Sequence, residues 1–383
     1  MEHITRRQFL LKQAMLVPVC LGVTGFAGKV SAGPEPFRGE APATLWKWSK
    51  QALFFKPLGQ KRVMCQLCPN ACVLSPGDRS ACRSRVNMDG VLYSLTYGNP
   101  CAVHVDPVEK KPLYHFKPGS RVFSIATTGC NFRCLNCQNW EISQARPEDV
   151  RFYEMFPSMV AQKADESGSV SVAYTYSEAI TYFEYMMDCS AEAKAKGLSN
   201  LLISNGFIRR EPLDDLCRLI DAANINLKSF SEDIYQKLNQ GRLRPVLETF
   251  MTLNRKNIHF EITNLVIPGY TDDIEMFKIM CGWILDTLGD THPFHVLRFF
   301  PHYRLNRIRP TPVRTLERFR DTARHMGLNY TYIGNVPGHE GNHTYCHGCG
   351  KPLIRREGYQ IPEFHIKNDS CVFCQTRIPG IWE

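Results

Sequence analysis

The residues of this 383-residue chain best suited to chemistry are its cysteines, 16 in number, because most of them fall into spaced groups. A C-x2-C pair lets two thiolates converge on one metal, so we interpret the groups as metal sites rather than disulfides. The groups are Cys65, Cys68, Cys72 and Cys82; Cys130, Cys134 and Cys137; and Cys346, Cys349, Cys371 and Cys374. Five others stand apart and are expected to be ordinary buried thiols: Cys20, Cys101, Cys189, Cys217 and Cys281.

The middle group is a C-x3-C-x2-C run within "TTGCNFRCLNCQNWEIS", residues 127–143. Its three thiolates can hold three corners of a [4Fe–4S] cluster and leave the fourth iron open for a substrate or cofactor. The alternative is an incomplete zinc knuckle that a distant residue completes.

The two outer groups have four cysteines each. Cys346-x2-Cys349 and Cys371-x2-Cys374, separated by 21 residues, are close to the zinc-ribbon pattern, with a rubredoxin-like iron or an auxiliary cluster as the alternative. The first group, with gaps of two, three and nine residues between Cys65 and Cys82, fits zinc or a second iron–sulfur cluster, and ligand type does not separate the two.

Alternating strand and helix patterns begin at Arg121 and position the middle group. Between the strands lie amphipathic helical stretches such as 177–197, 211–223 and 272–289. This alternation predicts an α/β fold, a partial (β/α)6 TIM-like barrel, with the C-x3-C-x2-C run directly after the first strand. The predicted strands are 121–127, 169–175, 200–205, 224–228, 258–267, 294–300 and 329–334.

The pattern also divides the chain into segments. We expect a leader at 1–32, a linker at 33–60, a cysteine-rich module at 61–115, the barrel at 116–335 and a zinc-ribbon-like module at 336–383.

His339 and His343 lie near the C-terminal cysteine group, and we interpret them as solvated or hydrogen-bonded rather than ligating.

The leader has a basic start, an apolar run and "VSA" at residues 30–32 as a cleavage-site pattern. "TRRQFLLK", residues 5–12, is typical of a twin-arginine export signal, which predicts a periplasmic or membrane-peripheral protein. The alternative is a chance basic and hydrophobic N-terminus on a cytoplasmic protein. Lipidation at Cys20 is not favoured, because Val19 stands where a small residue is needed.

The bulk composition is that of a globular protein, with 44% hydrophobic and 22% charged residues. The formal net charge of +9 is spread along the chain, without a basic block that interleaves aromatic residues. Nucleic acid is therefore not indicated as a partner.

A C-x3-C-x2-C run after the first barrel strand resembles the radical S-adenosylmethionine enzymes. In that superfamily the fourth iron binds the amino and carboxylate groups of the cofactor, and one electron cleaves the sulfonium to a 5′-deoxyadenosyl radical. The resemblance implies cofactor contacts in "YSEA", "SNGF", "NLKSFSEDIYQKL", "NLVIPGYTDD" and "FFPHY". The residues at the matching positions are Asn136, Ser177, Glu178, Ser204, Asn205, Lys228, Val266, Ile267 and His302.

The chain departs from the family pattern at four places. Asn136 replaces an aromatic residue that often packs on the adenine, and Ala179 replaces a proline after Glu178. Asn226 stands where an aspartate is common, and "FFPHY" departs from a stretch in which relatives often show His and Asp. The family match also favours Arg298 as a contact for the cofactor carboxylate.

A narrower resemblance is to the radical enzyme of the AmmeMemoRadiSam system, carried by "CQLCPNACVLSPGDRSACRSR", "YIGNVPG", "TYCHGCGKPLIRREGY" and "CVFCQTRIPGIW". It implies a one-electron reductant of the flavodoxin or ferredoxin kind. It also implies hydrogen abstraction from a substrate carbon or, as in the glycyl-radical activating enzymes, from a partner protein. The alternatives are a non-catalytic iron–sulfur electron carrier or scaffold, and a nucleic-acid modifying radical enzyme.

Overall fold

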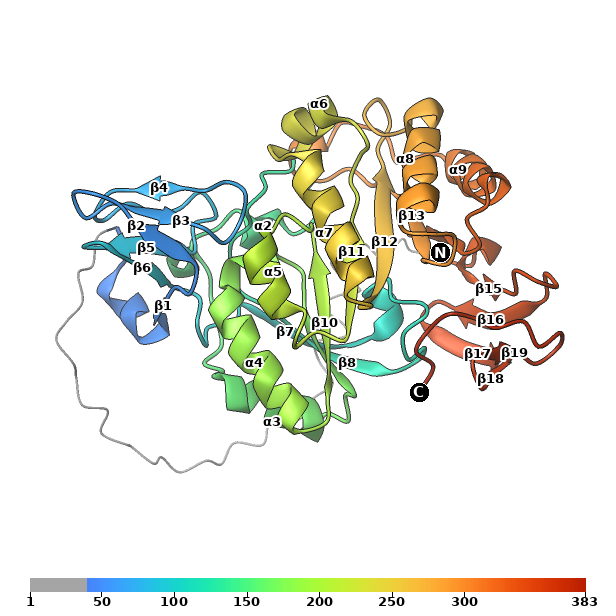
Figure 1. Cartoon of the computed structure of the whole chain (residues 1–383), viewed down its shortest axis with the longest axis horizontal. Coiled ribbons are helices and arrows are strands. Elements are labelled where there is room, and N and C mark those ends of the chain that lie inside the picture. Colours follow the sequence, from blue (N-terminus) through green and yellow to red (C-terminus); the bar gives the residue numbers. More distant parts are fainter. Residues whose placement is uncertain (1–39) are drawn as a thin grey trace, which may run out of the picture. The chain divides into compact units, whose positions relative to one another are not determined.

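The computed structural model describes residues 40–383, so the leader predicted at 1–32 lies outside the described residues. Its centre is a sheet of eight strands in the order β14-β13-β12-β11-β10-β9-β8-β7 (Figure 1). Every neighbouring pair from β8 to β14 is parallel, and β7 joins the edge antiparallel to β8. The strands are β7 Ala102–Pro107, β8 Arg121–Ala126, β9 Ser171–Tyr174, β10 Ser199–Ser204, β11 Ala222–Asn226, β12 His259–Val266, β13 Phe294–Arg298 and β14 Thr331–Gly334.

The α/β fold predicted from the sequence is confirmed. Each of the six strands from β8 to β13 is followed by a helix, and β14 is the predicted seventh strand of the parallel series. With β14 at one edge and β7 at the other, the sheet is an open, partial barrel. The helices are α2 Trp140–Ser143, α3 Pro157–Glu166, α4 Phe183–Ala195, α5 Arg210–Leu216, α6 Glu232–Ile234, α7 Leu243–Arg255, α8 Ile274–Thr287 and α9 Val313–Met326.

Local sequence explains the helix ends. The Asp273 carboxylate accepts hydrogen bonds from the backbone N–H groups of Glu275 and Met276 and so caps α8, and Gly327 ends α9 with a left-handed φ of 116°. The helix predicted at 211–223 is shorter than expected. It ends at Leu216 because residues 222 and 223 already pair in β11.

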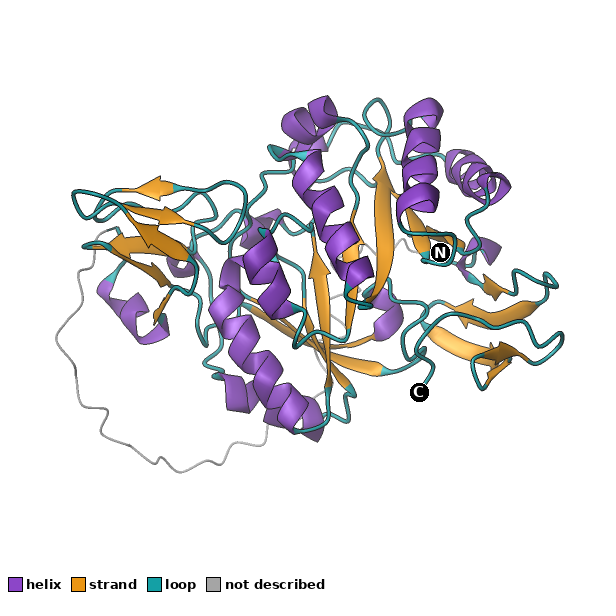
Figure 2. Cartoon of the chain, in the orientation of Figure 1, coloured by secondary structure: helices purple, strands orange, loops and turns teal. Residues whose placement is uncertain are grey.

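Helices cover the outer face of the sheet (Figure 2). Aromatic pairs join the layers: the ring of Phe250 in α7 lies 5.7 Å from that of Phe260 in β12, and Phe277 in α8 lies 5.7 Å from Phe294 in β13. Alternate strand residues therefore form the apolar core, and their neighbours face the inside of the partial barrel.

The inner face is filled at the amino ends of the strands. Val108, Leu113 and Phe116, from the segment between β7 and β8, pack against Val122 and Ala173. The inner end away from the C-x3-C-x2-C run is thus closed by the chain itself, which agrees with the rule that parallel barrels carry their chemistry at the opposite end.

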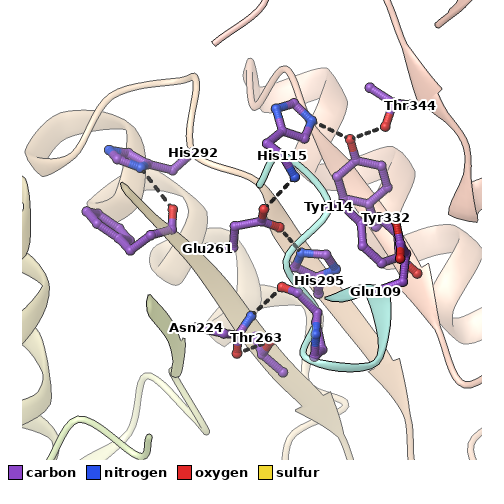
Figure 3. Close-up of polar contacts among 12 residues, drawn as sticks. Glu109, Tyr114, His115, Asn224, Glu261, Thr263, His292, His295, Tyr332 and Thr344 are labelled. Atoms are coloured by element: carbon purple, nitrogen blue, oxygen red, sulfur yellow. Dashed lines mark hydrogen bonds and ion pairs between the residues drawn. The ribbon is translucent and has the colours of Figure 1, made fainter. Parts of the chain in front are cut away.

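A buried polar network completes this closed end (Figure 3). The Glu261 carboxylate of β12 accepts a hydrogen bond from the His115 backbone N–H at 2.6 Å and contacts His295 Nε2 at 2.5 Å. His115 Nε2 lies 2.7 Å from the Tyr332 hydroxyl, which bonds Thr344 of the C-terminal module. Burial raises the pKa of Glu261, but hydrogen bonds from the neighbouring histidines outweigh it and hold this pKa well below the usual range.

Two small modules flank the sheet, at the left and lower right of Figure 1. The first has two three-stranded sheets, ordered β1-β6-β5 and β2-β3-β4, and the second has β15-β16-β17 and β18-β19. Their strands are β1 Lys50–Gln51, β2 Phe55–Pro57, β3 Val63–Cys65, β4 Val73–Leu74, β5 Arg85–Met88, β6 Val91–Ser94, β15 Thr344–Tyr345, β16 Pro352–Glu357, β17 Gln360–Phe364, β18 Ile366–Lys367 and β19 Ser370–Cys371.

Two of the segment boundaries expected from the sequence shift. The linker expected at 33–60 is structured from residue 43, because Leu45 and Trp48 are buried against Val86 and Met88 of the first module. The central sheet begins at β7, inside the segment expected to belong to the cysteine-rich module, since a short edge strand carries no strand–helix alternation. None of the helices within residues 40–383 is long and apolar enough to cross a membrane.

Candidate functional site: a thiolate loop at the carboxyl end of the sheet

The loop after β8 carries Cys130, Cys134 and Cys137, and a second segment holds it in place. The Arg133 and Leu135 N–H groups donate to the carbonyls of Asn239 and Leu238, both at 2.9 Å. Asn239 also donates from Nδ2 to the Cys134 sulfur at 3.1 Å. The loop is therefore held by the π-helical turn Tyr235–Asn239 as well as by its own sequence.

The thiols of the loop would need a nearby positive charge to ionise. Burial raises the pKa of Cys137 to about 11, and burial likewise raises that of Cys130 well above its ordinary value. Neutral thiols are the stable form in such surroundings unless a metal cation supplies positive charge. A donor set of three thiols suits iron.

Glu178 lies at the centre of the predicted cofactor contacts. It is buried, and its carboxylate accepts hydrogen bonds from the Ser204 hydroxyl at 2.6 Å and the Asn205 N–H at 2.9 Å. Asn205 Nδ2 in turn lies 3.9 Å from the Cys130 sulfur. Burial raises the pKa of Glu178, and the Ser204 and Asn205 hydrogen bonds oppose that rise. The ends of β8, β9 and β10 thus meet at one carboxylate.

Lys228, after β11, joins the same site electrostatically. Its ammonium lowers the pKa of both Glu178 and Cys137, although burial is the larger effect on each and raises the pKa. Asn226, two residues earlier, donates from Nδ2 to the Ser204 carbonyl at 3.2 Å. The amide at this departure from the family pattern therefore joins β11 to β10.

Val266 ends β12, and Ile267 follows it beside the thiolate loop. Both are buried, and Ile267 packs in a cluster with Leu135 of that loop. His302 begins a turn whose Arg304 and Leu305 N–H groups donate to the Leu135 carbonyl at 3.0 and 3.2 Å. The segment after β12 and the turn after His302 both contact the thiolate loop at Leu135.

Several buried polar atoms around the loop have no protein hydrogen-bond partner within residues 40–383. They include Asn136 Oδ1, Ser177 Oγ, Thr128 Oγ1 and Asn239 Oδ1. Buried polar atoms are rarely left unpaired, so this set fits a polar cofactor bound among them. The residues present therefore fit both an iron–sulfur cluster and a ligand beside it.

Three features of the site were missed at the level of sequence. Asn239 ends a π-helical turn, Tyr235–Asn239, and the following Gln240 has a left-handed φ of 53°. At Gly241 a Cβ atom would lie 2.2 Å from the Phe132 ring. The only signal was "LNQGR", because π-helical turns are frequent at functional sites but have no distinct residue pattern.

The comparisons with known proteins agree with this geometry. A family model described as the radical SAM superfamily matches residues 124–279. An uncharacterized protein of Methanocaldococcus jannaschii is 42% identical over 331 residues, which is 86% of this chain and 98% of that protein.

This chain belongs to the radical SAM superfamily.

Other relatives of this radical SAM enzyme are activating enzymes. The pyruvate formate-lyase 1-activating enzyme of Escherichia coli K12 is 27% identical over 228 residues, covering 55% of this chain and 91% of that enzyme. The recognition as a radical SAM enzyme related to the activating enzymes is confirmed.

Solved structures are also similar to this chain. TYW1 with a lysine–pyruvate adduct bound has a TM-score of 0.43 at 17% identity and covers 61% of this chain and 87% of its own. Streptococcus suis SuiB bound to S-adenosylmethionine has a TM-score of 0.44 at 13% identity, and the match covers 60% of this chain and 53% of SuiB.

The C-terminal cysteines of the radical SAM enzyme form a tight group. Cys346 and Cys374 sulfurs are 3.6 Å apart, Cys349 and Cys371 sulfurs are 3.8 Å apart, and all four lie within 4.8 Å of one another. Four sulfurs placed tetrahedrally at about 2.3 Å from one zinc are about 3.8 Å apart. The sulfur spacing therefore suits a single tetrahedral metal ion.

Other predicted positions have structural partners. His339 Nε2 lies 3.2 Å from Glu317, and His343 Nδ1 accepts the Arg356 N–H at 3.2 Å, so both are hydrogen-bonded as interpreted. Arg298 donates from Nε to the Thr311 carbonyl at 2.8 Å. Of the isolated cysteines, Cys189 and Cys281 are buried, Cys101 and Cys217 are half-buried, and Cys20 lies outside the described residues.

Proposed function

We propose that this radical SAM enzyme binds S-adenosylmethionine at Cys130, Cys134 and Cys137 and cleaves it reductively to abstract hydrogen from a substrate. The observation that carries the proposal is the meeting of Glu178, Ser204 and Asn205 beside Cys130. Ser177 Oγ and Asn136 Oδ1 are buried without a protein hydrogen-bond partner among residues 40–383. A [4Fe–4S] cluster with one open iron supplies the electron that breaks the sulfonium bond.

The residues of the chain have distinct tasks in this proposal. Glu178 accepts the ammonium of the methionyl group, because a buried carboxylate is stabilised by a cation. Ser177, Ser204, Asn205 and Lys228 orient the ribose and carboxylate. Val266 and Ile267 shield the adenine side, and Asn136 replaces an aromatic contact with a polar one. His302 orders the turn behind the loop.

We propose a protein as the substrate, by analogy with the activating enzymes that are 27% identical to this chain. The electron comes from a flavodoxin- or ferredoxin-like donor. The motifs in both small modules support membership of the AmmeMemoRadiSam system, whose members are candidate partners. A closed site is needed, because water and solvent protons would compete with a reactive radical.

A direct test is anaerobic reconstitution with iron and sulfide, followed by dithionite and S-adenosylmethionine. We expect release of 5′-deoxyadenosine from the wild type and none from Cys134→Ala. Cys217→Ser, which changes a half-buried thiol outside the three groups, is the matched control and should keep the activity. A fully loaded wild type that releases no 5′-deoxyadenosine would contradict the proposal.

For the C-terminal group we propose zinc at Cys346, Cys349, Cys371 and Cys374, supported by the sulfur spacing of a single tetrahedral ion.

We also propose export through the twin-arginine pattern at residues 5–12. Sequencing the mature N-terminus in the native host tests export. A chain that keeps Met1 and fractionates with the cytosol would overturn it.

A further inference from the structure

We propose that Cys65, Cys68, Cys72 and Cys82 hold a second [4Fe–4S] cluster rather than zinc, placed to pass single electrons to the Cys130 loop. The identity of this metal centre stands on its own geometry. Its electron-transfer role rests on the function proposed above.

The fold brings the four cysteines around one space. Cys65 ends β3, and its N–H donates to the Cys72 carbonyl at 2.9 Å, which turns the chain between them. Cys82 lies ten positions after Cys72, yet it lines the same cavity as Cys65, Cys68 and Cys72. The nine-residue gap between Cys72 and Cys82 is longer than that of a metal knuckle, but the turns of the module bring Cys82 back to the other three cysteines.

The spacing of the sulfurs separates a cluster from zinc. One zinc ion draws four sulfurs to within about 3.8 Å of one another and leaves no space between them. The C-terminal group has this tight arrangement. Cys65, Cys68, Cys72 and Cys82 instead line a common cavity. In a cubane each thiolate binds a different iron, so the sulfurs lie further apart around a central space.

A buried cation faces this cavity. Arg85 lines it, is fully buried, and donates from both terminal nitrogens to Glu184 at 3.0 and 2.7 Å. Its Nε has no protein hydrogen-bond partner within the described residues. Glu184 balances the guanidinium charge, but the Nε–H of Arg85 remains available in the cavity wall, and such a donor suits the sulfur of a thiolate-ligated cluster.

The cavity also adjoins the Cys130 loop. Asn131, the residue directly after Cys130, lines it together with Thr181 from the Glu178 segment. Asn70 Nδ2 donates to the Asn131 carbonyl at 2.8 Å, and Ser84 Oγ donates to the Thr128 carbonyl at 3.1 Å. The wall of the cavity and the Cys130 loop are therefore in direct contact, which provides a short path for an electron.

The redox step involves one electron and no bond or proton change. A low-potential one-electron donor of the flavodoxin or ferredoxin class is oxidised, and the cluster at Cys65 to Cys82 is reduced. That cluster then returns to its oxidised state as the centre at the Cys130 loop gains the electron. The first module thus acts as the electron entry point for the barrel.

Metal analysis of the full-length chain, purified without oxygen, tests the assignment. We expect about eight irons and about one zinc in the wild type, and about four irons with a [4Fe–4S] Mössbauer spectrum in Cys134→Ala. The Cys134→Ala variant leaves the first module intact, so it stays informative even if Cys68→Ala does not fold. Cys134→Ala protein with two zincs and no iron would overturn the proposal.

The relay is tested in Cys68→Ala with two reductants. We expect the remaining cluster to show an electron paramagnetic resonance signal that S-adenosylmethionine shifts. Release of 5′-deoxyadenosine should fall at least about tenfold with reduced flavodoxin, and change little with dithionite, which is small enough to reach the loop directly. Equal rates with flavodoxin in Cys68→Ala and Cys217→Ser would overturn the relay. Two clusters without any cleavage in the wild type would instead contradict the proposed function and leave the metal assignment standing.

Discussion

Gly129 lies directly against the backbone of Cys82. A Cβ atom at position 129 would be 2.6 Å from the Cys82 carbonyl oxygen and 2.2 Å from Ser84 Oγ. Gly129 also has a left-handed φ of 101°, which L-residues with a side chain rarely adopt. This contact joins the first cysteine-rich module to the residue immediately before Cys130, so the two sulfur groups are parts of one assembly.

Replacing Gly129 with alanine should disrupt the contact between the first cysteine-rich module and the Cys130 loop of the barrel. We expect Gly129→Ala to lower the free energy of unfolding by at least about 3 kcal/mol, because it adds a clash to the backbone strain. Gly289→Ala is the control, with a φ of 98° and no atom within 4 Å of the added Cβ. It should cost only about 1 kcal/mol. Equal losses for both variants in urea denaturation would show that the contact with Cys82 does not matter.

Removing the charge of Glu178 should weaken cofactor binding. We expect Glu178→Gln to raise the Kd for S-adenosylmethionine by about thirtyfold, the equivalent of about 2 kcal/mol for a charge-assisted hydrogen bond. Isothermal titration calorimetry on the reconstituted protein measures it, with Glu192→Gln on the exposed side of α4 as control. An unchanged Kd would remove Glu178 from the cofactor site.

Arg356 anchors the C-terminal module beneath the barrel. It is buried, stacks 4.0 Å from the centre of the Tyr114 ring and donates to the Tyr114 carbonyl at 3.0 Å. We expect Arg356→Ala to lower the free energy of unfolding by about 3–5 kcal/mol. Arg355→Ala, which removes an exposed partner of Glu363, should change it by less than about 1 kcal/mol. A similar melting temperature for both variants would contradict this anchoring role.

Acid should destabilise the closed end of the barrel. His115 lies between the Pro379 carbonyl and the Tyr332 hydroxyl, and burial lowers its pKa from 6.5 to about 3. Below pH 6.5 the unfolded chain binds a proton that the folded chain does not, so stability falls as the pH drops toward 3.

The slope for His115 should reach about 1.4 kcal/mol per pH unit. His292, whose pKa burial lowers to about 4, adds a loss of the same sign. Denaturation between pH 5 and 7 should therefore show a flatter profile for His115→Gln. The exposed His325 is the control position, and His325→Gln should keep the wild-type slope. An unchanged slope in His115→Gln would exclude His115 as a source of the acid sensitivity.

Zinc in the C-terminal module should be independent of iron. We expect Cys374→Ala to lose about one zinc per chain and to keep the wild-type iron content, because the sulfur group of the Cys130 loop is built by other strands. Elemental analysis by mass spectrometry measures both metals. A parallel loss of iron would show that the modules fold as one cooperative unit.

Much of the central sheet could be predicted from the chain itself. The segments predicted as strands at 121–127 and 258–267 correspond to β8 and β12, since both are rich in the β-branched and aromatic residues that favour strands. The edge strand β7 was not predicted, because His104 and Val105 are exposed and the pairing with β8 is decided across an intervening segment. Asn239 was missed for a similar reason, because its contact with Cys134 joins positions 105 residues apart.

The sequence by itself determined which thiolates exist, their order and their local reach, and hence the superfamily and its cofactor. Only the tertiary structure decided how the sulfurs are spaced, which cysteine groups lie next to one another, and which side chains surround them. Spacing along a chain limits distances within a single turn. Distances between turns depend on strand pairing and side-chain packing, such as the contact of Gly129 with Cys82, and these are set by the whole fold.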